Sequence, residues 1–287
     1  MALGLATLWH WDWQWESLAR SNRVGSSIDE AEVSDNNARD RRFPALRSAG
    51  RNSYRVLADA MLDGGEPALD LACGDGYLLE LMRSGSAYLG ADRNLAELDA
   101  ANRRLRHATP LVQADAARLP VATAALQSVS CHFALMLLQP LEDVLAELAR
   151  VLRPDGLLGV MLPASPPEEP PTPWSAFRAA WRDVTTTYPV VIPPLQDDRA
   201  LQREQLTAVL TDAGFASLAI RSFSVSRHMT VDEATRALLL TYLPDLLPPA
   251  GFAQLEQALA PALTELAAED GMVLFVEHAD LVTARRC

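Results

Sequence analysis

Two glycines and two aspartates carry the clearest chemical signal in the sequence. The stretch Ala68–Leu78 reads ALDLACGDGYL, an apolar run interrupted by Asp70 and followed by a turn with Gly74 and Gly76. Because glycine lacks a Cβ, such a turn lets the backbone come close to a bound molecule, and the free N–H groups of a following helix point toward it. The stretch therefore predicts a strand, a ligand-binding turn and a helix start.

Asp92 is the second aspartate of interest. It follows Gly74 at close to the ~20-residue spacing at which an acid at a strand end meets ribose hydroxyls. A carboxylate can accept hydrogen bonds from two adjacent hydroxyls at once, which suits an acid to this position. Alternatively, Asp92 caps a helix that starts at Asn94. A dinucleotide fingerprint would place a third glycine where Leu79 stands, so the sequence disfavours a nicotinamide cofactor.

Elements that would position these residues alternate between strands and helices, which is typical of an α/β fold. Strands are expected at Ala68–Ala72, Ala87–Asp92, Pro110–Asp115, Leu126–Leu138, Leu157–Pro163, Ser217–His228 and over the closing GMVLFVEHADLVTARR. Helices are expected at Pro44–Leu62, Tyr77–Ser84, Leu95–Arg106, Leu141–Leu152, from a Thr172 cap to Tyr188, at Arg199–Ala213, from a Thr230 cap, and at Ala250–Ala268. Arg153–Gly156 is expected to form a turn before the fifth strand.

Composition and charge limit the class of protein and the partners. A chain of 287 residues with 49% apolar residues can bury the core of one large domain with an appendage, or of two small domains. Its net charge of −12, from 25 basic and 37 acidic residues, disfavours a nucleic-acid partner. Neither a membrane span nor a signal peptide is evident, and the three cysteines lack metal spacing. We therefore expect a cytoplasmic protein, a monomer or homodimer, with reduced thiols and no metal.

Four motifs in order resemble those of class I S-adenosylmethionine (SAM) methyltransferases, in the branch similar to ubiquinone and menaquinone biosynthesis enzymes. They are ALDLACGDG, AYLGAD, PLVQAD followed by Leu119-Pro120, and SVSCHF, and the later phrase ELARVLRPDGLLGV is also similar to this branch. The resemblance covers residues 65–163. The sequence departs from the branch at Gln127, where an aspartate usually opens the strand.

The resemblance implies a fold and a cofactor site. The fold is a seven-stranded, mostly parallel, doubly wound sheet with helical lid insertions and an N-terminal extension. The cofactor is SAM, with an acid at the end of the third strand pairing with the adenine amino group and Cys131-His132-Phe133 beside the methionine part. The implied cofactor-binding residues are Asp70, Ala72, Cys73, Gly74, Gly76, Asp92, Arg93, Asp115, Ala116, His132 and Phe133.

The sequence divides into four predicted segments. Residues 1–45 form a poorly ordered extension or lid, in which Trp9, Trp11, Trp13 and Trp15 could also dock on the domain, a partner or a substrate. Residues 46–163 form the SAM-binding core, 164–199 a proline-rich lid insertion, and 200–287 the rest of the sheet with a helical insertion that covers the substrate. Residues expected to contact the substrate are Tyr54, Trp174, Trp181 and Tyr188. The stripe of Trp174 and Trp181 could equally pack a helix on the core.

Methyl transfer is an in-line displacement that needs mostly positioning, so no conspicuous catalytic group is required. If the acceptor is a hydroxyl, His228 is the candidate base and His132 the second candidate. The predicted function is methyl transfer from SAM to O or N of a small organic molecule. The alternatives are an RNA, protein or carrier-bound acceptor, or a binding or assembly protein that keeps the SAM fold without transfer activity.

Overall fold

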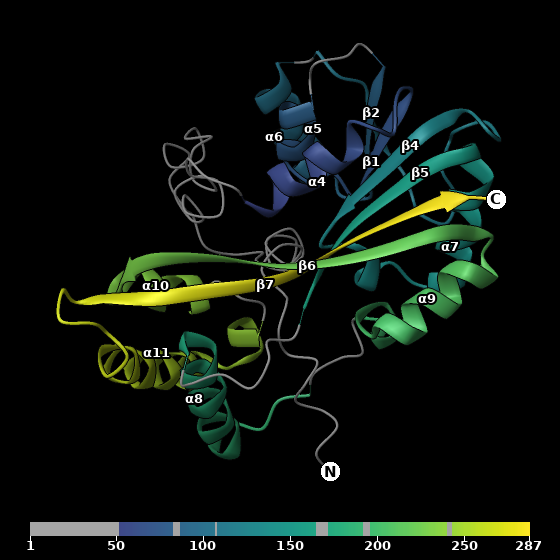
Figure 1. Ribbon diagram of the computed structural model, residues 1–287. Coiled ribbons are helices and arrows are strands. Elements are labelled where there is room, and N and C mark those ends of the chain that lie inside the picture. Colours follow the sequence, from purple (N-terminus) through teal and green to yellow (C-terminus); the bar gives the residue numbers. More distant parts are fainter. Residues whose placement is uncertain (1–51, 83–86, 107, 165–171, 192–195, 240–242) are drawn as a thin grey trace. The chain divides into compact units, whose positions relative to one another are not determined.

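The computed structural model describes residues 52–82, 87–106, 108–164, 172–191, 196–239 and 243–287, and the chain forms two compact units (Figure 1). The core unit contains the described residues of 52–164, 196–223 and 279–287. The helical unit contains those of 172–191 and 224–278. The predicted extension 1–45 with its four tryptophans lies outside the described residues. Each unit is described by itself below.

A seven-stranded sheet in the order β3-β2-β1-β4-β5-β7-β6 organises the core unit. β1 to β5 pair in parallel, and β7 runs antiparallel to β5. The strands are β1 (Ala68–Leu71), β2 (Tyr88–Asp92), β3 (Leu111–Gln113), β4 (Leu126–His132), β5 (Leu152–Pro163), β6 (Phe215–Thr230) and β7 (Met272–Arg286). The predicted seven-stranded, mostly parallel α/β sheet with an antiparallel last strand is therefore confirmed.

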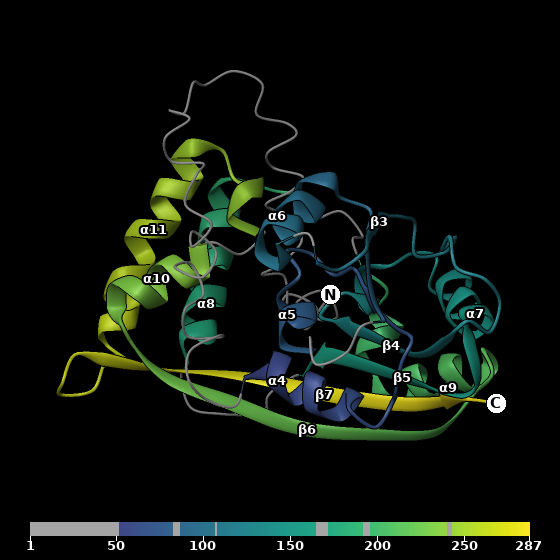
Figure 2. The ribbon, with the colours of Figure 1, turned by 90° about the horizontal axis from the view of Figure 1, so that it is seen from above.

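Helices cover both faces of this sheet, as expected of a doubly wound fold. Figure 2 shows α4, α5 and α6 on one side of the sheet and α7 and α9 on the other. The core-unit helices are α4 (Ser53–Met61), α5 (Tyr77–Met82), α6 (Leu95–Leu105), α7 (Leu141–Val151) and α9 (Arg203–Asp212), with short 3-10 helices η1 (Leu135–Leu137) and η2 (Asp198–Leu201). None of the helices in the described ranges combines the length and the apolar composition needed to cross a membrane.

α7 shows how the sequence pattern builds the core. Its apolar residues recur at helical spacing, and Leu141, Val144, Leu145, Leu148 and Val151 are all buried in the main hydrophobic cluster with residues of β1, β4 and β5. Two acids lie in its first turn and Arg150 in its last, which suits the helix dipole. This packing fixes α7 against the sheet.

The helical unit contains α8 (Pro173–Thr187), α10 (Val231–Leu239), η3 (Leu243–Leu246) and α11 (Pro249–Thr264), together with the adjoining parts of β6 and β7. α8 packs on α11 and α10. The predicted caps are confirmed: the Thr172 side chain accepts from the Ser175 N–H, and Thr230 and Glu233 form the expected reciprocal pair.

Three predicted elements are corrected by the structure. β4 ends at His132 rather than Leu138, because Phe133 has a φ of 48° that turns the chain out of the strand. Residues 153–156, predicted as a turn, lie within β5 as an irregularity whose first three residues are exposed, because the register with β4 shifts there. The predicted helix Arg199–Ala213 is split into η2 and α9 by the extended backbone of Gln202.

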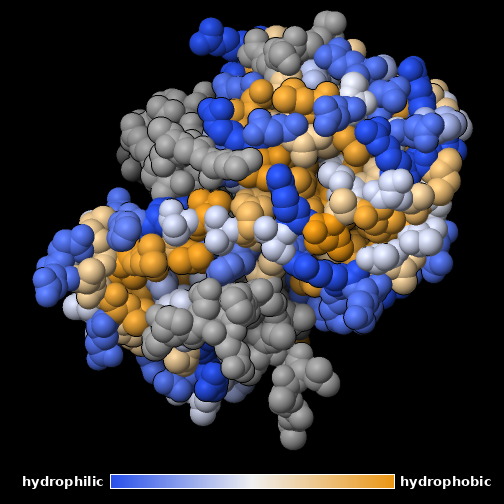
Figure 3. Space-filling model, in the orientation of Figure 1, coloured by the Kyte–Doolittle hydropathy of each residue, from blue (hydrophilic) through white to orange (hydrophobic). Residues whose placement is uncertain are grey.

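A shallow groove of about 500 Å³ lies on the face of the sheet beside α4. Its floor includes Leu157, Ala219 and Leu281, and charged side chains such as Asp63 and Arg221 also line it. On the face shown in Figure 3, hydrophobic side chains gather between hydrophilic ones over this part of the core unit.

The packing of α7 predicts a measurable contribution to stability. Leu148 is fully buried, so Leu148→Ala removes apolar contacts and leaves a cavity, which should reduce the unfolding free energy by about 2–5 kcal/mol. Leu95 is 57% exposed, and Leu95→Ala should change it by less than about 0.5 kcal/mol. Urea unfolding followed by circular dichroism measures both. Equal losses in the two variants would contradict the assignment of α7 to the core.

Candidate functional site

The carboxylate of Asp92 is held beside the glycine turn by two backbone donors. The Gly74 N–H donates to Asp92 Oδ2 at 3.0 Å, and the Asn94 N–H donates to Oδ1 at 2.9 Å. Asp92 ends β2 next to β1, where the Cys73 N–H also bonds the Ala91 carbonyl at 3.0 Å. Each carboxylate oxygen retains capacity to accept a second hydrogen bond. The geometry thus presents a fixed pair of acceptors next to the turn.

Burial influences the ionisation of Asp92. Desolvation raises the pKa of its carboxyl, and the backbone N–H groups of Asn94 and Gly74 lower it in partial compensation. A half-buried carboxylate of this kind is stabilised by further hydrogen-bond donors. The N-cap of α6 is Asn94, whose side chain accepts the Ala96 N–H at 3.0 Å, so the alternative that Asp92 caps this helix is wrong. The hydroxyl-accepting role is compatible with the position of Asp92, since its bonds to Asn94 and Gly74 leave acceptor capacity.

The turn itself adopts a left-handed backbone at three positions. Ala72, Gly74 and Gly76 have φ values of 53°, 51° and 77°. At Gly76 a Cβ would lie 3.0 Å from Ala101 Cβ of α6, so the missing side chain allows α6 to pack against the turn. Gly76 therefore serves close helix packing, in addition to the backbone conformation of the turn.

Arg104 of α6 clamps the same turn. Its Nε donates to the Asp75 carbonyl at 3.1 Å, its Nη2 binds Asp75 Oδ2 at 3.0 Å, and its Nη1 binds Glu80 at 3.0 Å. The guanidinium also lies 5.4 Å from the ring centroid of Tyr77. Sequence analysis did not single out Arg104, because nothing in its local pattern distinguishes it from other arginines on a helix surface.

Asp70 lies beneath the turn as a fully buried carboxyl. Ser130 of the neighbouring β4 donates to its Oδ1 at 3.0 Å. Burial raises the pKa of Asp70 to about 8, the Ser130 hydrogen bond lowers it, and the charge of Asp92 raises it. Burial likewise raises the pKa of the Cys73 thiol well above its ordinary value. Burial therefore favours the protonated form of both groups.

Aromatic side chains gather where β1 and β4 end. Tyr54 of α4 stacks on His132 with ring centroids 3.6 Å apart, and its edge contacts Tyr77 at 4.9 Å. Phe133 follows His132 and lies 4.4 Å from that ring. The positive φ of Phe133 is unusual for a bulky residue and is typical of a functional position. This arrangement brings the predicted Tyr54, His132 and Phe133 together with Tyr77, which sequence analysis missed although it follows the turn directly.

His132 is buried, and its Nε2 lies 3.0 Å from Ser53 Oγ at the start of α4. Ser53 was also missed, since it lies in a stretch whose pattern predicted only a helix. The contacts of His132 with Ser53 and Tyr54 join α4 to the end of β4. They indicate that His132 positions α4, and its role as a base stays a prediction.

Asp115 follows β3, the strand that pairs with β2. The Ala114 N–H bonds the Asp92 carbonyl at 3.1 Å, which ties the two strand ends together. The Asp115 side chain is exposed, and its Oδ1 accepts the Ala117 N–H at 2.9 Å. Ala116 is half-buried against the core, whereas Arg93 is exposed.

Four of the predicted site residues lie in the helical unit. Trp181 is buried and stacks on Phe177, and Trp174 is half-buried with its ring 5.5 Å from that of Phe275. The half-buried ring of Tyr188 lies close to Gly251 of α11, and His228 is exposed on β6. Within its own unit Trp181 packs the helical core. Among the described residues no group of three His, Cys, Asp or Glu side chains is placed to hold a metal ion.

The order of these elements matches a known family. The family model described as "Methyltransferase domain" matches residues 69–160, from β1, which precedes the glycine turn, to β5. Residues 69–160 form a methyltransferase domain. Its sheet and its motif order are those of class I SAM-dependent methyltransferases, which confirms the resemblance read from the sequence.

Two curated proteins are similar to part of this chain. A demethylmenaquinone methyltransferase from Lactobacillus johnsonii is 35% identical over 112 residues, covering 36% of this chain and 46% of that protein. A malonyl-[acyl-carrier protein] O-methyltransferase from Enterobacter lignolyticus is 33% identical over 118 residues, covering 40% of this chain and 44% of that protein. The chain therefore spans less than half the length of these relatives.

Solved structures agree with the fold. The YcgJ protein from Bacillus subtilis matches with a TM-score of 0.54 at 15% identity, over 81% of this chain and 98% of that one. A SAM-dependent methyltransferase from Thermotoga maritima matches with a TM-score of 0.52 at 13% identity, over 96% of this chain and all of that one (100%). At these identities the likeness concerns the fold.

The residues of the methyltransferase domain fit SAM as the cofactor. The oriented carboxylate of Asp92 offers acceptors for two ribose hydroxyls, and the exposed carboxylate of Asp115, one strand further along, offers one for an amino group. The left-handed turn from Ala72 to Gly76 occupies the strand end between them and the aromatic cluster. No part of this arrangement conflicts with an adenosyl ligand.

Asp92→Ala should weaken binding of SAM, or of its product S-adenosylhomocysteine, at least tenfold. The variant loses two ribose hydrogen bonds to a charged acceptor, each worth ~1.5–3 kcal/mol, and also the anchor of the Gly74 N–H. Isothermal calorimetry measures the dissociation constant. The control variant Asp99→Ala removes an exposed carboxylate of α6 outside the proposed site and should leave the dissociation constant unchanged. Unchanged affinity in folded Asp92→Ala protein would rule out the ribose role.

Asp70 predicts how stability depends on pH in the protein without ligand. Its folded pKa of about 8 lies above its ordinary value of 3.8, so its stabilising contribution is full below about pH 4 and is lost as the pH rises to about 8. Asp70→Asn keeps an acceptor for Ser130 and cannot ionise. The unfolding free energy of Asp70→Asn minus that of the wild type should therefore be larger at about pH 8 than at about pH 5, as measured by denaturant unfolding. A constant difference between the two proteins at both pH values would contradict the assignment.

Proposed function

We propose that this chain is a SAM-dependent methyltransferase that transfers a methyl group to O or N of a small organic molecule. The carboxylate of Asp92, fixed by Gly74 and Asn94 beside the glycine turn, is the observation that carries the SAM-binding part of the proposal. SAM supplies the methyl group, which it carries on a sulfonium. The chain's own residues then have to bind, orient and desolvate the reactants, which by positioning alone can lower a barrier by ~7–11 kcal/mol.

In this proposal the cofactor-contacting residues are those around the turn and the neighbouring strand ends. They comprise Asp70, Ala72, Cys73, Gly74, Gly76, Asp92, Arg93, Asp115, Ala116, His132 and Phe133. Asp70, whose neutral form is favoured by burial, accepts the hydrogen bond of Ser130 beneath the turn. Phe133 and the stacked pair of Tyr54 and His132 exclude water from the end of β4.

The small-molecule part of the proposal is supported by the appended helical unit and by the charge. α8, α10 and α11 are inserted after β5 and β6, and the half-buried rings of Trp174 and Tyr188 offer apolar surface to an acceptor. We propose Tyr54, Trp174, Trp181 and Tyr188 as acceptor-binding residues, with Trp181 acting through the packing of α8. The net charge of −12 disfavours a polyanionic acceptor such as RNA.

A carrier-bound acceptor is the second candidate, favoured by the match to a malonyl-[acyl-carrier protein] O-methyltransferase. The match to a demethylmenaquinone methyltransferase favours an acceptor that is not bound to a carrier protein. The two candidates separate in one assay. Protein incubated with methyl-labelled SAM is offered a panel of small phenols, amines and carboxylates, and in parallel an acyl-carrier protein charged with short acyl groups. Methylation of the carrier-bound acyl groups alone would overturn the small-molecule proposal.

His228 is the proposed general base for a hydroxyl acceptor. With an acceptor identified in the panel, His228→Gln should lower kcat by ~10²–10⁴-fold at neutral pH and leave S-adenosylhomocysteine affinity unchanged. Ser226→Ala, at another exposed position on β6, is the matched control and should retain full turnover. Full activity in His228→Gln would remove His228 from the mechanism and leave positioning as the source of catalysis.

A further inference from the structure

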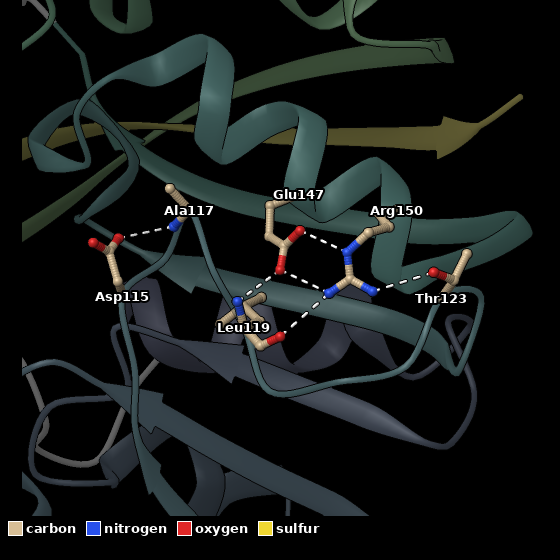
Figure 4. A network of polar contacts seen from close by, with 6 residues as sticks. All are labelled: Asp115, Ala117, Leu119, Thr123, Glu147 and Arg150. Carbon is tan, nitrogen blue, oxygen red and sulfur yellow. Dashed lines mark hydrogen bonds and ion pairs between the residues drawn. The ribbon is translucent and has the colours of Figure 1, made fainter.

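The sequence ELARVLRPDG contains two charged residues of α7, Glu147 and Arg150, that are not among the proposed cofactor contacts. Glu147 and Arg150 lie on the side of α7 that meets the segment from Asp115 to Thr123, as Figure 4 shows. Glu147 Oε1 accepts the backbone N–H of Leu119 at 2.6 Å. Arg150 donates to the Leu119 carbonyl at 3.2 Å and to Thr123 Oγ1 at 3.3 Å. Both backbone groups of Leu119 are therefore bound by α7.

The two side chains also hold each other. Arg150 Nε and Nη2 bind the two oxygens of Glu147, each at 2.7 Å, in a bidentate pair. The hydrogen bond from Arg150 and the N–H of Leu119 lower the pKa of the Glu147 carboxyl. Because α7 is buried along its other face, this pair is anchored to a rigid element.

Asp115 lies at the start of the segment held in this way (Figure 4). Its Oδ1 accepts the Ala117 N–H at 2.9 Å, and its carbonyl accepts the Arg118 N–H at 2.9 Å. These bonds make a tight turn between Asp115 and Leu119. Leu119 is thus joined to Asp115 by a short, hydrogen-bonded turn.

We propose that Glu147 and Arg150 are positioning residues for base recognition. They fix the segment from Asp115 to Leu119 so that the exposed Asp115 carboxylate accepts a hydrogen bond from the exocyclic amino group of adenine. This inference rests on the proposed role of Asp115 and extends it to two residues that contact no ligand. In this inference Glu147 and Arg150 of α7 contribute to the discrimination of adenine from other purines.

A merely structural role for the pair would weaken all ligands equally, so the test measures discrimination. Calorimetry compares S-adenosylhomocysteine with the same compound carrying hypoxanthine, whose carbonyl oxygen replaces the amino group and cannot donate to Asp115. The wild type should prefer adenine by about tenfold or more. Glu147→Ala should reduce that ratio toward one, because Leu119 loses its acceptor. Glu147→Gln should restore most of it, since the amide oxygen still accepts the Leu119 N–H.

Glu142→Ala is the matched control. Glu142 is exposed on the same helix and pairs with Arg199 rather than with the segment from Asp115, so its ratio should equal that of the wild type. Arg150→Met provides a second route to the same answer if Glu147→Ala does not fold, because it removes the donors to the Leu119 carbonyl and to Thr123.

Asp115→Ala, which removes the acceptor, separates the two levels of the proposal. If Asp115→Ala loses the preference while the folded Glu147 and Arg150 variants keep it, the positioning inference is overturned and the role of Asp115 stands. If Asp115→Ala keeps the preference, the adenine role of Asp115 is wrong and the inference fails with it. Loss of the preference in Asp115→Ala, Glu147→Ala and Arg150→Met, with Glu142→Ala unchanged, supports the inference.

Discussion

The hydrogen bond from the Gly74 N–H to Asp92 Oδ2 joins the ends of β1 and β2, and the rest of the site depends on it. A carboxylate so close to the sheet is costly to desolvate, and burial raises its pKa accordingly. The backbone donors of Gly74 and Asn94 offset that cost and at the same time fix the direction of both oxygens. The same contacts therefore stabilise the turn and prepare an acceptor pair for a ligand.

Neighbouring elements maintain this geometry from three sides. α6 packs against Gly76, and its Arg104 donates hydrogen bonds to the backbone carbonyl and to the carboxylate of Asp75. α4 contributes Tyr54, whose stack with His132 closes the end of β4. α7 binds Leu119 through Glu147 and Arg150 and so places the segment after β3. A methyltransferase that relies on positioning requires this kind of rigidity, because small displacements of the reactants slow transfer strongly.

The fold and the cofactor motifs could be predicted because they are local. Each signal depends on residues that are close together in the sequence: the turn of Gly74 and Gly76, the spacing to Asp92, and the apolar stripe of α7. The clamp by Arg104 and the contact of His132 with Ser53 could not be predicted, because they join residues far apart in sequence whose own windows look ordinary. The composition of residues 153–156 predicts a turn, whereas pairing with β4 includes them in β5. The positive φ of Phe133, which shortens β4, has no compositional signal at all.

A crystal structure with S-adenosylhomocysteine tests the central claim most directly. The account predicts both ribose hydroxyls within about 3.2 Å of the Asp92 oxygens, with the Gly74 N–H still bonded to Oδ2. It also predicts the adenine amino group at the Asp115 carboxylate. A ligand bound elsewhere, or one bound at the turn with the Asp92 carboxylate directed away from the ribose, would contradict it.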